Sequence, residues 1–192
     1  MKEELKLRRF TIGFVGRLVK EKGIIDLLKA AAGLEDDTSL LIVGNGPLER
    51  EIKKFARKFN MKGRLIIKSG CQREEVPQYL SAMDLLVVPS LSTRHWKEQF
   101  GRIIIEAWGC LVPVIGSSSG HIPGLIGPAG LVFEEGDILD MRYKIKQVKK
   151  NIRLRLQLIE RGKIRLKDNY TWEKVAEKIY KSYQSLYENR SH

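Results

Sequence analysis

Residues 11–44 read TIGFVGRLVKEKGIIDLLKAAAGLEDDTSLLIVG, and this stretch decides the fold class. Thr11–Val15 and Ser39–Val43 are short, mainly apolar runs without polar alternation, the pattern of strands that are buried on both faces. Between them, Gly23–Ala32 carries apolar residues at helical spacing. A strand, a helix and a second strand in this order predict a parallel βαβ unit.

The same alternation continues as far as Phe133. Apolar runs predict further strands, and the patterns between them predict helices. The strands are expected at Arg64–Lys68, Asp84–Val88, Pro113–Ile115 and Gly130–Phe133, with helices near 47–59, 76–83 and 101–109. We therefore expect an α/β fold with a doubly wound, Rossmann-like parallel sheet, in which ligands bind outside the carboxyl ends of the strands.

After Phe133 the sequence predicts helices only. Residues 152–158 alternate like a strand, but a helix is favoured because a strand added there would have no partner. A final helix is expected over Trp172–Glu188, with Thr171 as its N-cap.

The composition is that of a folded domain. The chain has 192 residues, of which 43% are hydrophobic and 30% charged, which excludes a disordered chain. The bias to Lys, Arg and Glu is typical of thermophiles. Cys71 and Cys110 lack metal-ligand spacing, which favours free thiols in a reducing cytoplasm. The charged N-terminus does not resemble a signal peptide, and prolines interrupt the uncharged stretch 109–133, which excludes a membrane helix there.

The net charge of +12 is concentrated in one segment. Between Met141 and Lys167 there are eleven basic residues and a single acid, Glu160. Such a segment could bind RNA or an anionic membrane. A solvated helical face is a better explanation than nucleic-acid binding, because Tyr143 is the only aromatic residue among these cations.

The loop after the first strand carries two cations near a helix start. It reads Gly16-Arg-Leu-Val-Lys-Glu-Lys-Gly23. Gly16 would let a ligand approach the backbone closely, and Arg17 and Lys22 flank the N-terminus of the coming helix. The two cations could neutralise a diphosphate without a metal ion. Taken alone, such residues are more often solvated loop charges.

Glu98 and Glu106 frame the start of the helix expected at 101–109. Because Glu106 lies between Ile105 and Ala107 in an apolar helix, we expect its carboxylate to be buried and to need donors such as ribose hydroxyls. The alternative is that Glu98 compensates the helix dipole and Glu106 is a surface residue.

Together these stretches resemble the C-terminal domain of family 4 retaining glycosyltransferases, the glycosyl transferases group 1. The resemblance covers Phe10 to Phe133, and Tyr170-Thr171-Trp172 resembles the end of that family's sequences. It rests on Gly16-Arg17…Glu21-Lys22-Gly23, Leu41-Ile-Val-Gly44-Asn-Gly-Pro47, Pro89-Ser90 and Glu98-x7-Glu106-Ala107…Gly109…Pro113-Val114 in this order. The family implies a GT-B architecture, in which two Rossmann-like domains face each other across a cleft.

The resemblance implies a metal-independent hexosyltransferase domain that binds a UDP-, GDP- or ADP-linked sugar, for transfer to a sugar or lipid-linked acceptor. Arg17 and Lys22 would bind the donor diphosphate. Glu98 would contact hydroxyls of the transferred sugar, and Glu106 the ribose. Arg17, Lys22 and Glu98 are the implied catalytic residues, and no metal or cofactor is expected. The other implied donor contacts are Gly16, Gly70, Cys71, Phe100, Gly101, Arg102 and Ile103.

The resemblance also predicts the domain organisation. Residues 1–170 are expected to form the nucleotide-sugar-binding domain, and residues 171–192 a helix that crosses to an N-terminal domain absent from this chain. Without that domain we expect donor binding with negligible transfer. A cytoplasmic protein is expected, with peripheral contact to the anionic inner face of the membrane as an open alternative.

Two loops depart from the family's pattern. Ser119–Gly124 has His121 where a second glycine is common, and Gly124 where a glutamate is usual. Leu91–Lys97 is longer than in many relatives and would bring Arg94, His95 and Trp96 near the donor sugar. A sugar-nucleotide epimerase of the same architecture is an alternative, but the Arg/Lys loop with the spaced glutamates favours transfer.

Overall fold

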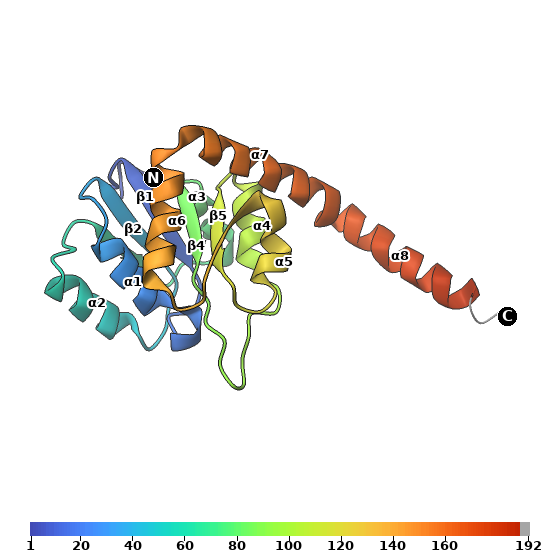
Figure 1. Ribbon diagram of the computed structural model, residues 1–192, viewed down its shortest axis with the longest axis horizontal. Helices are drawn as coiled ribbons and strands as arrows, with labels where there is room; N and C mark the ends of the chain where they lie inside the picture. Colours follow the sequence, from blue (N-terminus) through green and yellow to red (C-terminus); the bar gives the residue numbers. More distant parts are fainter. Residues whose placement is uncertain (189–192) are drawn as a thin grey trace.

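Six parallel strands form the centre of the structure, a computed structural model that describes residues 1–188 (Figure 1). Each lies within two residues of its predicted position, which confirms the α/β assignment. The strands are β1 (Phe10–Val15), β2 (Thr38–Val43), β3 (Leu65–Lys68), β4 (Leu85–Val88), β5 (Val114–Ser117) and β6 (Gly130–Phe133).

The strand order is β3-β2-β1-β4-β5-β6, and every neighbouring pair is parallel. Ile12 of β1 is opposite Leu40 of β2 on one side and Leu85 of β4 on the other. The order of the strands along the sheet therefore reverses between β1 and β4. In open α/β sheets a crevice for ligands opens at this point, outside the carboxyl ends of the two strands.

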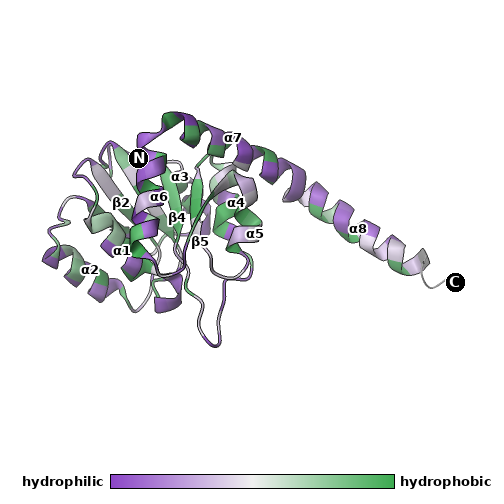
Figure 2. Cartoon of the chain, viewed as in Figure 1, coloured by the Kyte–Doolittle hydropathy of each residue, from purple (hydrophilic) through white to green (hydrophobic). Residues whose placement is uncertain are grey.

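Helices cover both faces of the sheet. One face carries α1 (Ile24–Ala32), α2 (Glu49–Lys58) and α6 (Ile138–Lys150), and the other carries α3 (Val76–Leu80), α4 (Arg102–Gly109) and α5 (Ile122–Ile126). Short 3-10 turns lie at η1 (Lys20–Lys22), η2 (Arg73–Glu75) and η3 (Gly127–Ala129). Successive residues of a strand enter opposite cores: Leu40 and Leu85 face α1, whereas Leu41 and Leu86 face α4. The strands are accordingly mainly hydrophobic, and β4 and β5 are largely green in Figure 2.

The chain after β6 is helical, as predicted. Helix α7 (Ile152–Asn169) includes the alternating residues 152–158, and Asn151 caps it by accepting the backbone N–H of Leu154 at 2.9 Å. Helix α8 (Trp172–Glu188) continues beyond α7 away from the body of the domain (Figure 1). Its predicted cap is also present, since the Thr171 hydroxyl accepts the N–H of Lys174 at 3.3 Å.

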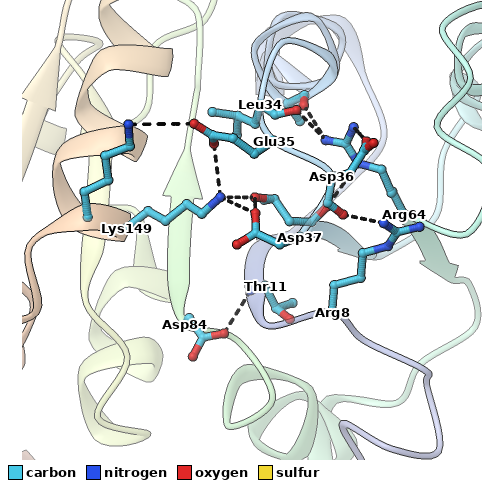
Figure 3. Close-up of polar contacts among 12 residues, drawn as sticks. Arg8, Thr11, Leu34, Glu35, Asp36, Asp37, Arg64, Asp84 and Lys149 are labelled. Atoms are coloured by element: carbon cyan, nitrogen blue, oxygen red, sulfur yellow. Dashed lines mark hydrogen bonds and ion pairs between the residues drawn. The ribbon is translucent and has the colours of Figure 1, made fainter.

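A network of polar contacts fastens the amino edge of the sheet (Figure 3). Lys149 of α6 donates to Glu35 at 3.0 Å, to Thr38 Oγ1 at 2.9 Å and to Asp37. A hydrogen bond from Lys149 is the main cause that holds the pKa of Asp37 below its ordinary value. At Glu35 a hydrogen bond from the backbone lowers the pKa first, and Lys149 lowers it further. Both carboxylates therefore stay ionised at neutral pH and hold α6 against the start of β2.

Three local predictions were wrong. Pro47 is not the first residue of a helix, because α2 begins at Glu49. Helix α3 ends at Leu80 and not near residue 83. Asp84 does not open β4: its carboxylate accepts the backbone N–H of Thr11 at 2.8 Å, which joins the start of β4 to β1. Within the described part of the chain, no helix combines the length and apolar composition that a bilayer crossing needs.

Candidate functional site

The loops after β1 and β4 meet at the point where the strand order reverses. The N–H of Leu91 donates to the carbonyl of Glu21 at 2.8 Å. Gly23 has φ = 65°, and a Cβ atom there would lie 1.7 Å from the carbonyl oxygen of Pro89. Only glycine allows the turn η1 to pack this closely against the end of β4. The motif glycine thus brings the cations of the first loop beside the second loop.

Lys22 and Glu98 form an ion pair in this crevice. The ammonium of Lys22 lies 2.6 Å from Glu98 Oε2, and the side chains are 21% and 13% exposed. The same carboxylate oxygen accepts the Ser90 hydroxyl at 3.1 Å. Two residues that were predicted to bind different parts of one ligand therefore lie in direct contact. The pair is shielded enough for its electrostatic interaction to be stronger than at an open surface.

A pocket of about 310 Å³ opens beside this pair. It is lined by Arg17, Lys22, His95, Trp96, Lys97, Glu98 and Gln99. Arg17 is 69% exposed and 3.8 Å from Glu21, so little in the protein fixes its guanidinium. The pocket thus has a cationic side, a carboxylate and an aromatic ring, which suits an anionic ligand with hydroxyl groups. Larger hollows, such as that along α2 and β3, lie away from this group of residues.

The loop between β4 and α4 extends beyond the carboxyl edge of the sheet in Figure 1. Hydrogen bonds hold both its first and its second half against the loops that follow β5 and β6. In the first half of the loop, the Ser92 hydroxyl donates to Glu135 at 2.8 Å and lies 3.0 Å from the Ser119 hydroxyl. In the second half of the loop, the carbonyl of Glu98 accepts the N–H of His121 at 2.9 Å. Gly120, with φ = 54°, allows this contact, because a Cβ atom there would lie 2.2 Å from the same carbonyl oxygen.

Helix α4 begins directly after the pocket. Its N-cap is Gly101, with φ = 66°, so no N-cap side chain accepts from the first backbone N–H groups of the helix. Glu106 was expected to be buried, and this was wrong: its side chain is 32% exposed and lies 3.4 Å from Arg102 Nε. Arg102, one turn earlier on the helix, thus forms an ion pair with Glu106. Ile103 is partly buried against the core, and Phe100 is exposed and packs edge-on against Tyr170.

The remaining sequence-derived residues lie at the ends of β1 and β3. Gly16 follows β1, and its N–H donates to the carbonyl of Val43 at 3.0 Å. Gly70 follows β3, and its N–H donates to Asn45 Oδ1 at 2.7 Å. Cys71 is partly buried, and burial raises the pKa of its thiol. These residues lie at the same edge of the sheet as the pocket but do not line it.

Sequence reasoning missed three contacts at this edge. Nothing in the sequence indicated that Lys22 would contact Glu98, since the two residues are 76 positions apart. The role of Ser90 and the bond from Ser92 to Glu135 were also missed. One signal was available for Glu135, because a carboxylate shortly after the last strand must lie at the carboxyl edge of the sheet.

The basic segment contributes nothing to the pocket. Lys149 and Arg142 contact the amino edge, where Arg142 donates to the carbonyls of Ala30 and Lys29 at the end of α1. Arg165 donates to the carbonyls of Leu125 and Gly124 at 2.7 Å each. Arg142 and Arg165 thus lie at helix C-termini, where positive charge is stabilising.

No group of three or more His, Cys, Asp or Glu side chains within residues 1–188 is arranged to hold a metal ion. The cationic side chains that line the pocket are those of Arg17, Lys22 and Lys97.

The sequence and the fold both match known proteins. The profile of the family described as glycosyl transferases group 1 matches residues 1–165. An uncharacterised glycosyltransferase of Methanocaldococcus jannaschii is 30% identical over 175 residues, which are 90% of this chain and 47% of that protein. The chain thus spans about half the length of the curated relatives that it matches.

Two solved structures share the fold. The Anabaena protein HepE in complex with UDP has a TM-score of 0.86 at 20% identity, over 96% of this chain and 51% of that chain. The C-terminal domain of a glycosyl transferase group 1 family protein from Francisella tularensis has a TM-score of 0.78 at 21% identity, over 88% and 91%. The fold is therefore that of a GT-B C-terminal domain.

Proposed function

This chain belongs to the family of glycosyl transferases group 1, and from that premise we propose that it binds a nucleotide sugar between the ends of β1 and β4. The observation that carries the proposal is the meeting of Lys22 and Glu98 at the reversal of strand order. A cation and a carboxylate in contact can bind the phosphate and the hydroxyl groups of one ligand. The Anabaena protein of the same fold was solved with UDP and with UDP-glucose, which supports this ligand class.

The roles that we propose follow the geometry. Lys22 binds the diphosphate, and Arg17, which is free to turn inward, adds a second cation. Glu98 accepts hydrogen bonds from hydroxyls of the sugar. The N–H groups at the start of α4 favour negative charge on the leaving nucleotide. Glu106, at the next turn, accepts from the ribose. Gly16, Gly70 and Cys71 border the nucleoside at the same edge.

We propose that this binding needs no metal ion. A nucleoside diphosphate leaves with negative charge that must be stabilised, and the pocket supplies positive charge through Lys22, Arg17 and the α4 N-terminus. The reaction is transfer of the hexose to a sugar or lipid-linked acceptor with retention of configuration.

Transfer itself is proposed to require a second, N-terminal Rossmann-like domain. Every residue assigned above contacts the donor, and a transferase must also hold the acceptor and exclude water. Helix α8 offers a surface for such a domain, because it extends from the body with Trp172, Ile179 and Tyr183 more than half exposed. We expect residues 1–170 to bind the donor and α8 to pack on the second domain.

The two glutamates give a test of the assigned roles. Glu98→Gln is expected to weaken binding of a nucleotide sugar relative to its parent nucleoside diphosphate, because only the sugar loses a carboxylate acceptor. The diphosphate alone should bind at least as well, since Lys22 is released from its ion pair. Glu106→Gln is expected to weaken both ligands by about 1 kcal/mol through the ribose. Calorimetric titration of UDP, GDP and ADP against their sugar conjugates measures each difference.

Glu74→Gln is the matched control, because Glu74 is an exposed carboxylate outside the pocket. If Glu98→Gln weakened the diphosphate as strongly as the sugar conjugate, Glu98 would not be the sugar contact. If Glu74→Gln weakened binding of both the diphosphate and the sugar conjugate, the cause would be a general change in structure.

A further inference from the structure

The Lys22 ammonium has a second partner besides Glu98. It lies over the ring of Trp96, 4.7 Å from the ring centroid. A cation over the face of an indole ring is attracted by the ring's electron distribution, and the attraction grows as water is excluded. Lys22 is only 21% exposed, so both contacts are largely shielded.

Donor binding would affect the two contacts of the Lys22 ammonium differently. If Glu98 binds the sugar and Lys22 the phosphates, the 2.6 Å pair between them must open or be shared with the ligand. The diphosphate also repels the Glu98 carboxylate. The indole ring carries no charge and accepts no conventional hydrogen bond, so it does not compete with phosphate for the three N–H donors of the ammonium. Of the two contacts, the one to Trp96 can persist with the ligand bound.

The fold holds Trp96 in place independently of Glu98. Residues Thr93 and Trp96 form a bridge, in which the N–H of Thr93 donates to the Trp96 carbonyl at 2.7 Å. The hydrogen bond from Ser92 to Glu135 fixes the loop just before this bridge. Trp96 is partly buried, whereas its neighbours His95 and Lys97 are exposed. All three residues line the pocket, and Trp96 is the most shielded of them.

We propose that Trp96 is a positioning residue for the donor phosphates: its ring keeps the Lys22 ammonium in place while Glu98 leaves Lys22 for the sugar. The proposal rests on the function proposed above in assigning the phosphate to Lys22. It differs from a purely structural role, in which Trp96 would only stabilise its own loop and every ligand would respond alike to its replacement.

A first experiment needs no nucleotide. Ring current from Trp96 shifts the ε-methylene protons of Lys22 upfield in the NMR spectrum of the full chain. We expect this shift in the wild-type chain and in Glu98→Gln, and its loss in Trp96→Leu. Random-coil shifts for Lys22 in Glu98→Gln would overturn the proposal, because the ion pair and not the ring would then hold the ammonium.

The second experiment measures binding of UDP or GDP, whichever binds, and of the matching nucleoside without phosphates. Trp96→Leu is expected to weaken the diphosphate about three- to tenfold and to leave the nucleoside unchanged, with Trp96→Phe in between. Trp172→Leu is the control, since Trp172 is 86% exposed on α8. Equal weakening of nucleoside and diphosphate would overturn the positioning role. If no diphosphate binds the wild-type chain while the NMR shifts are as expected, the proposed function fails and the contact to Lys22 stands.

Discussion

Lys22→Met is expected to weaken binding of a nucleoside diphosphate by about 2–3 kcal/mol, roughly thirty- to more than a hundredfold in the dissociation constant. The substitution removes a charge-assisted hydrogen bond to the phosphates. It also leaves the Glu98 carboxylate, which is 13% exposed, facing the ligand with no neighbouring cation. Both effects weaken binding, so Lys22→Met is expected to lower the affinity more than any other single substitution in the pocket. Titration calorimetry measures the loss.

Two further variants, Arg17→Met and Lys20→Met, are compared with Lys22→Met. Arg17 is 69% exposed and loosely held, so its loss is expected to cost less than that of Lys22, at about 1.5 kcal/mol. Lys20 belongs to the same loop but lies outside the pocket, and its replacement should change affinity less than twofold. Equal effects of Lys20→Met and Lys22→Met would mean that the loop acts only through its net charge.

Arg64→Met is expected to lower the free energy of unfolding by about 3–4 kcal/mol. The Arg64 side chain is buried and donates to the carbonyls of Ala31, Leu34 and Thr38 at 3.1 Å each, and to Asp36 at 2.9 Å (Figure 3). Methionine fills similar space but leaves three carbonyls without this donor. These carbonyls lie between the end of α1 and the start of β2, so the loss loosens that connection. Urea denaturation followed by circular dichroism measures the change.

Arg57→Met is the matched control for stability. Arg57 is exposed on α2, and its replacement should change the unfolding free energy by less than about 0.5 kcal/mol. An Arg64→Met variant as stable as Arg57→Met would show that water replaces the guanidinium at these carbonyls without cost. Donor affinity of folded Arg64→Met should be unchanged, because Arg64 is at the amino edge and the pocket is at the carboxyl edge.

Most of the fold could be predicted because the apolar pattern is strong. A strand buried on both faces has few alternatives, and Gly130–Phe133 was predicted to the residue. Helix α8 begins at the predicted residue, since Thr171 gives a clear start. The errors fell where a local pattern competes with a tertiary contact. Helix α3 ends at Leu80, and Asp84, four residues later, accepts the backbone N–H of Thr11.

The site was predictable as a set of loops but not as a set of contacts. Glycines and charges at strand ends indicated which loops would carry the ligand. The contact between Lys22 and Glu98 depends on how closely η1 packs on the end of β4, which the packing of Gly23 against Pro89 decides. The exposure of Glu106 was misjudged because its apolar neighbours Ile103 and Ile105 are themselves only partly buried.

We propose that the pocket beside Lys22 and Glu98 binds a nucleotide sugar without a metal ion. Titration calorimetry of the purified chain with UDP-, GDP- and ADP-linked hexoses in excess EDTA tests it most directly. We expect saturable binding of at least one of these donors, unchanged by added magnesium and lost in Lys22→Met. Binding that appears only after magnesium is restored, or no binding of any donor under either condition, would contradict it.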